Sequence, residues 1–171
     1  MFDNIRADFE AHDRNLGAQG FWAMIVYRFG RWRYGIQNSA LRKPFSFVYK
    51  VLFKIVQIIT GIELPCEVSI GKNFIIDHFG GIVVSGYASF GDDCRIRNGV
   101  TIGLRRTTDK GAPRIGNNVD IGAGAKLLGP IVIGDNVLIG ANAVVICDVP
   151  SNSIAIGVPA IIKKRSPPPI P

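Results

Sequence analysis

In its second half this chain has an aliphatic residue at every sixth position. Between residues 115 and 145 the positions with this spacing are Ile115, Ile121, Leu127, Ile133, Ile139 and Val145. Glycine follows four of the six, so the repeating unit is a hexapeptide with an aliphatic residue before glycine. Such a period fits neither the spacing of about 3.6 residues in a helix nor that of about 2 in a strand. It is typical of short strands that stack one coil upon another, so the sequence predicts a parallel β-helix.

The same spacing extends toward both ends of the chain. Ile156 follows the last regular repeat, and the earlier positions, in shifted frames, are Ile70, Ile76, Ile82, Phe90, Ile96 and Ile102. We therefore assign residues 61–160 to one solenoid. The chain is 47% hydrophobic, which is enough to form a core, and its 20 glycines suit a fold with frequent tight corners.

One segment interrupts the repeat. Between Ile102 and Ile115 the segment 104–113 is polar and basic, and glycine and proline lie at its end. We expect a loop that leaves the coil, which is where solenoids often carry function.

The first sixty residues lack the repeat and predict helices instead. The stretches Phe2–His12, Phe21–Tyr34 and Pro44–Ile59 have helical patterns, and the last is too short and too charged to be a confident membrane span. We interpret residues 1–60 as a helical cap region on the open end of the solenoid, with the segment 44–59 buried there. Residues 161–171 form a basic, proline-rich tail.

The charge of residues 1–60 allows a second interpretation of the cap region. Residues 1–60 hold nine Lys/Arg against four Asp/Glu, and arginines alternate with aromatic residues from Arg28 to Tyr34. This composition suits peripheral contact with a membrane surface. The start of the chain does not have the pattern of a signal peptide. The expected location is the cytoplasm, with the inner face of the membrane as an alternative.

The sequence disfavours both nucleic acid and metal ions as partners. The net charge is +7, but the basic residues are dispersed and no nucleic-acid-binding motif is visible. Cys66, Cys94 and Cys147 are odd in number and have no paired spacing, so we expect reduced thiols and no metal site.

His78 is the candidate general base. It is one of two histidines, the other being His12, and it lies inside the solenoid between Asp77 and the pair Gly80-Gly81. Histidine is the side chain best suited to proton transfer near neutral pH. An acid nearby would orient the imidazole.

Several motifs together resemble a known family. They are Asp77-His78, Gly80-Gly81-Ile82-Val83-Val84, Asn98-Gly99-Val100-Thr101-Ile102-Gly103, Ile121-Gly122-Ala123-Gly124-Ala125-Lys126 and Gly157-Val158-Pro159-Ala160. This set resembles the hexapeptide-repeat acyltransferases, and within them the serine acetyltransferases and their polysaccharide-modifying relatives, including the colanic-acid acetyltransferase type. The resemblance covers the whole solenoid and, more weakly, the N-terminal helices.

The resemblance implies an all-β left-handed parallel β-helix with a small N-terminal helical region, an exception to the usual right-handed crossover. It implies homotrimers that hold acetyl-CoA in the groove between neighbouring β-helices. It also implies that His78 deprotonates the acceptor hydroxyl, that the acid fifteen residues earlier, here Glu63, orients His78, and that Asp77 contacts substrate.

The resemblance further implies where acetyl-CoA is held. The expected cofactor-binding positions are Gly103, Gly122, Ala123 and Ala141 in the solenoid, with Lys163 and Lys164 near the cofactor phosphates. No metal is implied.

The acceptor is the point where the chain departs from the family pattern. Serine acetyltransferases carry an arginine-histidine pair before a proline in the extruded loop, and here Gly111-Ala112 precedes Pro113. A site that lacks a cation distinguishes poorly between acceptors with and without a carboxylate. Arg105 or Arg106 are the candidate substitutes, and the segment from Phe90 to Arg105 resembles the exopolysaccharide branch.

We therefore expect a sugar hydroxyl as acceptor, in exopolysaccharide or capsule biosynthesis. The alternative is L-serine, in cysteine biosynthesis. A third, weaker alternative is a scaffold without catalysis.

Overall fold

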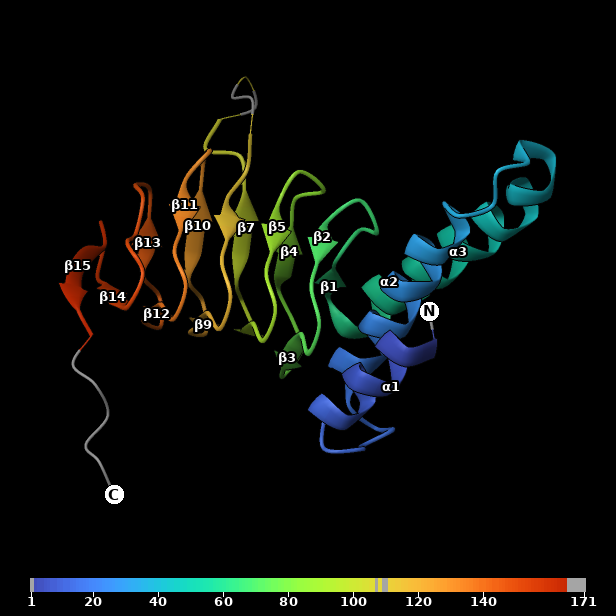
Figure 1. The fold of residues 1–171 in the computed structure, drawn as a ribbon, viewed down its shortest axis with the longest axis horizontal. Helices are drawn as coiled ribbons and strands as arrows, with labels where there is room; N and C mark the ends of the chain where they lie inside the picture. The colour runs from blue at the N-terminus through green and yellow to red at the C-terminus, as the bar shows by residue number, and fades with distance from the viewer. Residues whose placement is uncertain (1, 107, 109–110, 166–171) are drawn as a thin grey trace.

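The computed structural model of the chain describes residues 2–106, 108 and 111–165. Three helices come first, α1 (Phe2–Ala11), α2 (Gln19–Arg33) and α3 (Ser39–Thr60), and a stack of coils follows (Figure 1). Among the described residues, no helix combines the length and the apolar run that crossing a bilayer requires.

The coils consist of short strands. Their bounds are β1 Ile62–Glu63, β2 Ser69–Ile70, β3 Ile75–Asp77, β4 Ile82–Val84, β5 Ser89–Phe90, β6 Arg95–Arg97, β7 Thr101–Gly103, β8 Arg114–Ile115, β9 Asp120–Ile121, β10 Lys126–Leu128, β11 Val132–Ile133, β12 Leu138–Ile139, β13 Val144–Val145, β14 Ser153–Ile156 and β15 Ile161–Lys164.

Every third strand joins the same sheet. The first sheet has the order β1-β4-β7-β10-β13, the second β2-β5-β8-β11, and the third β3-β6-β9-β12-β14 with β15 at its end. All pairs are parallel except β14 with β15. Because each coil gives one strand to each sheet, the solenoid has about five coils, and the expected fold class, a left-handed parallel β-helix with N-terminal helices, is confirmed.

The six-residue repeat is explained by the core. One aliphatic side chain per strand points inward, and parallel register places it directly on its copy in the next coil. In the third sheet this column is Ile76, Ile96, Ile121, Ile139 and Ala155, all fully or almost fully buried.

The corners select residues that tolerate a left-handed backbone. One corner stacks Asn73, Asp93, Asn118, Asn136 and Asn152, each with φ between 51° and 58°. Their side chains bond along the stack, for example Asn118 Nδ2 to Asn136 Oδ1 at 2.8 Å. Short polar side chains with local hydrogen bonds are the non-glycine residues that adopt this conformation most readily.

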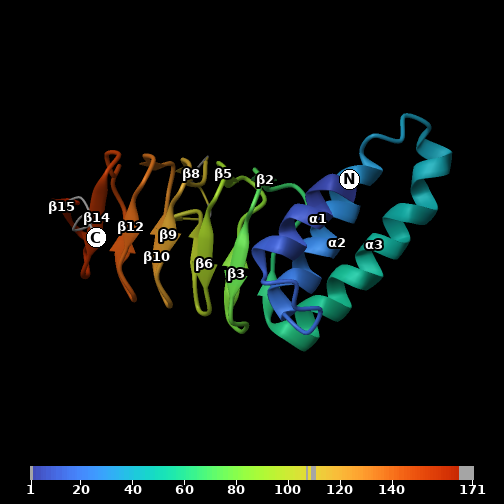
Figure 2. The ribbon, with the colours of Figure 1, turned by 60° about the horizontal axis from the view of Figure 1, so that its bottom comes forward.

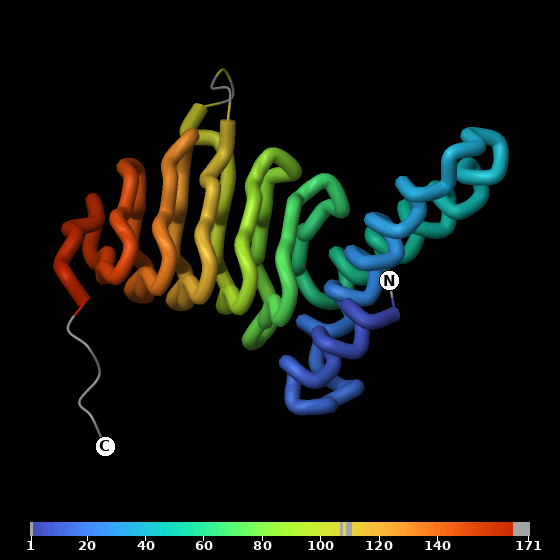
Figure 3. The backbone as a smooth tube through the Cα atoms, viewed as in Figure 1, coloured from blue at the N-terminus to red at the C-terminus, as the bar shows by residue number. Residues whose placement is uncertain are grey.

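The loop expected at 104–113 does leave the stack. Figure 3 shows the backbone rising away from the coils between β7 and β8. Three residues of this loop, at 107, 109 and 110, lie outside the described part of the chain.

The helices cover the open end of the solenoid, but not through the segment expected. Helix α2 packs on the first coil so tightly that a Cβ at Gly20 would lie 2.2 Å from the Ile76 carbonyl oxygen. Tyr27 Oη donates to the Val68 carbonyl at 2.8 Å. Helix α3, predicted as the buried cover over 44–59, buries only Tyr49 and Thr60 and lies on the outer side of α2 (Figure 2). That prediction was wrong, because α2 already occupies the end of the coil.

The assigned boundaries lie close to element ends. Gly61 closes α3 with φ of 65° and β1 begins at Ile62. Residues 161–164, which we assigned to the tail, form β15 and cover the last coil, and residues 166–171 lie outside the described part.

Candidate active site

His78 lies at a corner of the first coil. It follows directly after β3, has φ of 63°, and is exposed. Gly80 and Gly81 continue the turn with φ of 98° and 66° and lead to β4. This backbone directs the imidazole away from the core, so its position suits contact with a bound molecule.

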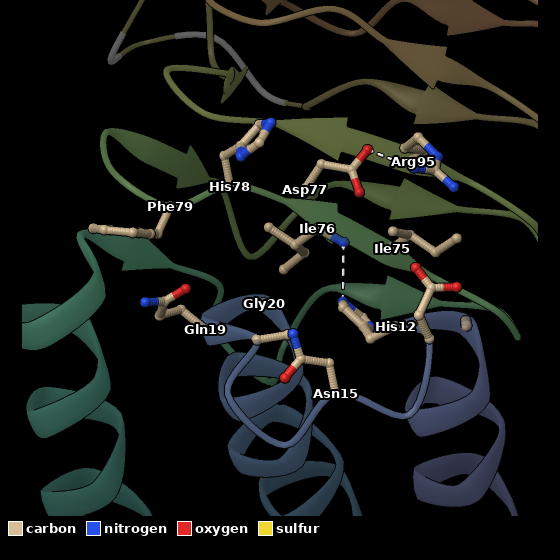
Figure 4. Close-up of a pocket in the computed structure, with 13 residues that line it drawn as sticks. His12, Asn15, Gln19, Gly20, Ile75, Ile76, Asp77, His78, Phe79 and Arg95 are labelled. Carbon is tan, nitrogen blue, oxygen red and sulfur yellow. Dashed lines mark hydrogen bonds and ion pairs between the residues drawn. The ribbon is translucent and has the colours of Figure 1, made fainter.

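The imidazole borders a cavity between the solenoid and the helices. The cavity has a volume of about 300 Å³. Figure 4 shows Asp77, His78 and Phe79 on the solenoid side, with Asn15 and Gln19 on the opposite side. Its polar and charged lining consists of His12, Asp13, Asn15, Gln19, Asp77, His78 and Arg95.

Asp77 is held in a network of ion pairs. Arg95 Nη1 lies 2.5 Å from Asp77 Oδ2, and Arg97 Nε lies 3.8 Å from the same oxygen. Arg97 also pairs with Asp120, and the hydrogen bond to that carboxylate raises the pKa of the Arg97 guanidinium. The expected substrate residue Asp77 thus has a cation beside it on the next coil.

His12 connects the helices to the segment that carries His78. Its Nδ1 lies 2.7 Å from the Asp8 carbonyl oxygen, and its Nε2 lies 3.3 Å from the Ile76 amide nitrogen. A carbonyl only accepts and an amide N–H only donates, so we assign the proton to Nδ1 and the lone pair to Nε2. The side chain is buried, with 7% exposure.

Glu63 has different neighbours from those expected. It accepts a hydrogen bond from Gln57 Nε2 at 2.8 Å, and Lys54 Nζ donates to Gln57 Oε1 at 2.7 Å. It lines a second cavity of about 330 Å³, which Gly103 also lines. Within the described residues no hydrogen bond joins Glu63 to His78, so its role as orienting acid stays a prediction.

The expected cofactor positions divide between two edges of the solenoid. Gly122, Ala123 and Ala141 lie at the corner between the third and first sheets, as His78 does. A Cβ at Gly122 would lie 2.5 Å from the Ala141 amide nitrogen, so that edge is narrow and made of small residues. Gly103 lies at the opposite end of the first sheet, beside the second cavity.

The basic residues of the prediction lie apart from His78. Lys163 and Lys164 belong to β15 at the far end of the stack (Figure 1). Arg105 packs near Gly129, where an added Cβ would lie 3.5 Å from the Arg105 Cβ. Among the described residues, the lining of the His78 cavity includes neither Arg105 nor Arg106.

Sequence reasoning missed five polar residues of the cavity: His12, Asp13, Asn15, Gln19 and Arg95. The first three lie in the connection between α1 and α2, and Gln19 begins α2. These four residues precede His78 by about sixty positions, and only the packing of the cap brings them near. Arg95 carried a usable signal, because it pairs with Ile75 one coil earlier and its side chain therefore lies on the same face of the sheet as that of Asp77, two residues along the strand. In the described part of the chain, no three His, Cys, Asp or Glu side chains gather as metal ligands would.

Comparison with known proteins gives consistent matches. The family described as "Bacterial transferase hexapeptide (six repeats)" matches residues 112–147. A serine acetyltransferase of Helicobacter pylori strain J99 is 39% identical over 142 residues, which are 82% of this chain and 79% of the relative.

Two solved structures add ligands to the comparison. A Brucella abortus serine acetyltransferase in complex with coenzyme A has a TM-score of 0.81 and 31% identity, with 97% of this chain and 68% of that chain covered. A Neisseria gonorrhoeae serine acetyltransferase in complex with serine has a TM-score of 0.77 and 29% identity, with 95% and 68% covered.

These matches correct two expectations. All three proteins are serine acetyltransferases, so the assignment to the exopolysaccharide branch and the preference for a sugar hydroxyl as acceptor were wrong. The error came from judging the acceptor by the loop at Gly111-Ala112 and by the likeness of the segment from Phe90 to Arg105 to the exopolysaccharide branch. A cation near His78 comes instead from the body of the solenoid, at Arg95.

Proposed function

Because this chain belongs to the serine acetyltransferase family of hexapeptide-repeat transferases, we propose that it transfers the acetyl group of acetyl-CoA to the hydroxyl of L-serine. Membership makes the chain an acyltransferase with acetyl-CoA as its donor, as the sequence predicted. The identity of the acceptor and the roles of individual residues are the proposal.

The charge pattern of the His78 cavity carries the proposal. Carboxylates of Asp13 and Asp77 and the guanidinium of Arg95 line one cavity with the imidazole. A free amino acid presents an ammonium and a carboxylate only a few atoms from its hydroxyl. Two carboxylates and a guanidinium match those two groups in sign, whereas an uncharged sugar hydroxyl uses neither.

In the proposed reaction one proton passes through the imidazole of His78, from the acceptor hydroxyl to the departing thiolate. His78 takes the proton of the serine hydroxyl while the serine oxygen forms a bond to the acetyl carbonyl carbon. The carbon–sulfur bond then breaks, and His78 returns the proton to the departing thiolate. No atom of the chain becomes acetylated, and the products are O-acetylserine and coenzyme A.

The edge that carries His78 suits the arm of the donor. Small residues stack along it, and an added Cβ at Gly99 would lie 3.3 Å from the Gly124 Cα, so the backbones of successive coils pack closely there with no large side chain between them. We assign Gly122, Ala123 and Ala141 to the pantetheine arm and Lys163 and Lys164 to the phosphates. A homotrimer with the donor between copies, and Glu63 as orienting acid, complete the proposal.

The test is release of free thiol from acetyl-CoA by the purified chain. We expect release with L-serine, and at least tenfold less with L-serine methyl ester, which lacks the carboxylate, and with N-acetyl-L-serine, which lacks the ammonium. Arg95→Met should raise the KM for L-serine, whereas Lys72→Met, an exposed change away from the cavity, should leave it unchanged. Absence of serine-dependent release, or equal rates with the ester, would overturn the proposal.

A further inference from the structure

The outer surface of α3 carries an unusual amount of exposed apolar area. Nine large apolar side chains of this 22-residue helix are more than one third exposed, and we call this surface the α3 face: Leu41, Phe45, Phe47, Val48, Val51, Leu52, Ile55, Ile58 and Ile59. Contiguous apolar patches beyond a few hundred Å² are rare on proteins that work as free monomers. The α3 face is therefore a candidate binding surface.

The packing of α3 explains why this surface faces outward. The side chains that contact the rest of the protein recur at intervals of three and four, at Ser46, Tyr49, Phe53, Val56 and Thr60, which is one side of a helix. Figure 2 shows α3 as the outermost helix, with α1 and α2 between most of its length and the strands. The opposite side of α3 is largely exposed, and among its large apolar side chains Phe45 contacts the aromatic rings of α2.

Positive charge borders the α3 face on one side. Lys43, Lys50 and Lys54 are seven and four positions apart, so they form a row along one edge of the apolar stripe. No aspartate or glutamate occurs from residue 14 to residue 62, a stretch that holds eight Lys/Arg. The charged side chains of α2, of α3 and of the connection between them are thus all basic.

Aromatic side chains extend the α3 face onto α2. Trp32 contacts Phe45 edge to face with ring centroids 5.4 Å apart, and Phe29 stacks on Trp32 at 5.8 Å. Trp32 is 40% exposed. Aromatic rings at the border between apolar and polar surface are typical of helices that lie in the headgroup region of a bilayer.

We propose that the α3 face binds the surface of a membrane that contains anionic lipids, with α3 parallel to the bilayer plane. Apolar side chains enter the boundary of the acyl chains, and the lysine row meets the lipid phosphates. This proposal is independent of the reaction, because no α3 residue lines the His78 cavity.

A second copy of the chain, bound through a two-fold contact of the α3 face, is the competing occupant, and charge disfavours it. A two-fold contact through the α3 face would place the lysine row of one copy against the same surface of the other. Neither α2 nor α3 contains an acidic residue to pair with those lysines. Like charges across an interface oppose binding, whereas lipid phosphates satisfy them.

Vesicle flotation of the full chain tests the proposal. We expect binding to vesicles with 30% phosphatidylglycerol, in phosphatidylcholine, weak binding to pure phosphatidylcholine, and loss of binding as salt rises. The double variant Val51→Gln/Ile55→Gln and the double variant Lys43→Glu/Lys50→Glu should each weaken binding at least tenfold. Tyr87→Gln and Lys72→Glu, exposed apolar and basic positions of the solenoid, are the matched controls and should bind as the wild type does.

Two further measurements separate the outcomes. In a Trp22→Phe variant the remaining Trp32 should shift its fluorescence to shorter wavelength with anionic vesicles. Light-scattering mass should be the same for wild type and Val51→Gln/Ile55→Gln, and circular dichroism should confirm folding. No vesicle binding by the wild type, or a lower oligomeric mass of the double variant with unchanged vesicle binding, would overturn the proposal and assign the face to a protein partner.

Discussion

The solenoid and the helical cap obtain their structure by opposite means. Each coil packs on the next through the same column of aliphatic side chains, so each of these residues contacts the equivalent residues of the neighbouring coils. The cap instead depends on single contacts between distant residues. Asp8 of α1 pairs with Arg28 of α2, which also donates to the Gly71 carbonyl oxygen at 2.8 Å.

The specific contacts of the molecule are therefore concentrated in the cap. In the solenoid, many similar apolar contacts share the stabilisation. A buried ion pair, in contrast, loses its stabilisation when either partner is removed. The His78 cavity lies at the border of the two regions and takes its charged lining from both. Changes to the cap should therefore alter the site as well as the stability.

The largest expected effect is on turnover. His78→Asn should lower kcat by about a hundredfold to ten-thousandfold, because it removes the group that moves the proton. Asparagine tolerates the left-handed backbone of this position, so folding should be kept. Steady-state thiol release measures the effect. The control is Asp93→Asn, a left-handed corner position away from the cavity, and a kcat of His78→Asn within threefold of wild type would remove His78 from its role.

Breaking the buried ion pair should cost the cap most of its stability. Arg28 and Asp8 have side chains that are 6% and 1% exposed, and loss of one partner of such a pair costs about 3–5 kcal/mol. Arg28→Ala should expose the amides of α1 and α2 to hydrogen exchange while the last coils stay protected. The paired change Asp8→Leu/Arg28→Met should cost less. Equal exposure of both regions would show that cap and solenoid unfold as one unit.

A cavity in the middle of the solenoid should affect its neighbours. Leu127 is fully buried in β10 between β7 and β13, and Leu127→Ala should cost about 2–5 kcal/mol. Urea denaturation measures the free energy of unfolding, and hydrogen exchange should show the loss in the coils on both sides. Leu127→Met is the volume-conserving control. Loss confined to β10 would contradict nearest-neighbour coupling.

Substitutions at the asparagine corner test the strain of a left-handed backbone without changing the hydrophobic core. Asn136→Ala places an ordinary residue at φ of 57° and removes bonds to Asn118 and Asn152, so the strain alone should cost about 1–2 kcal/mol. Asn136→Gly loses the same bonds but not the conformation, and it should cost less. Denaturant midpoints of the two variants compare strain with hydrogen bonding, and equal midpoints would assign the whole effect to the side-chain bonds.

The smallest expected effect is at alkaline pH. Burial raises the pKa of the Cys94 thiol to about 11 from its ordinary 9.0. The folded state therefore disfavours the thiolate, so the contribution to stability is complete below pH 9.0 and is lost as the pH rises through 11. Stability curves of wild type and Cys94→Ala should converge over that range. In the native state iodoacetamide should modify exposed Cys147 and spare buried Cys94, and modification of both at pH 8 would contradict this.

Much of the solenoid was predictable because its signal is local and repeated. Ile121 and Ile139 are identified as core residues by spacing alone, and the same spacing revealed the loop after Ile102. His78 was found as the only histidine of the solenoid, next to an acid and two glycines. The neighbours of Glu63 were not predictable, since Gln57 reaches it from α3 through the orientation of a helix that no repeat specifies.

The sequence alone predicted the β-helix, the helices that precede it and the candidate base. The tertiary structure decided which helix covers the coil, which surface of α3 stays exposed, and that Asp13 and Arg95 line one cavity with His78. The physical reason is the range of the interactions. Stacking of coils follows a fixed period that the chain repeats, whereas the seat of the cap depends on single long-range contacts, such as that of Gly20 with the Ile76 carbonyl, which leave no period in the sequence.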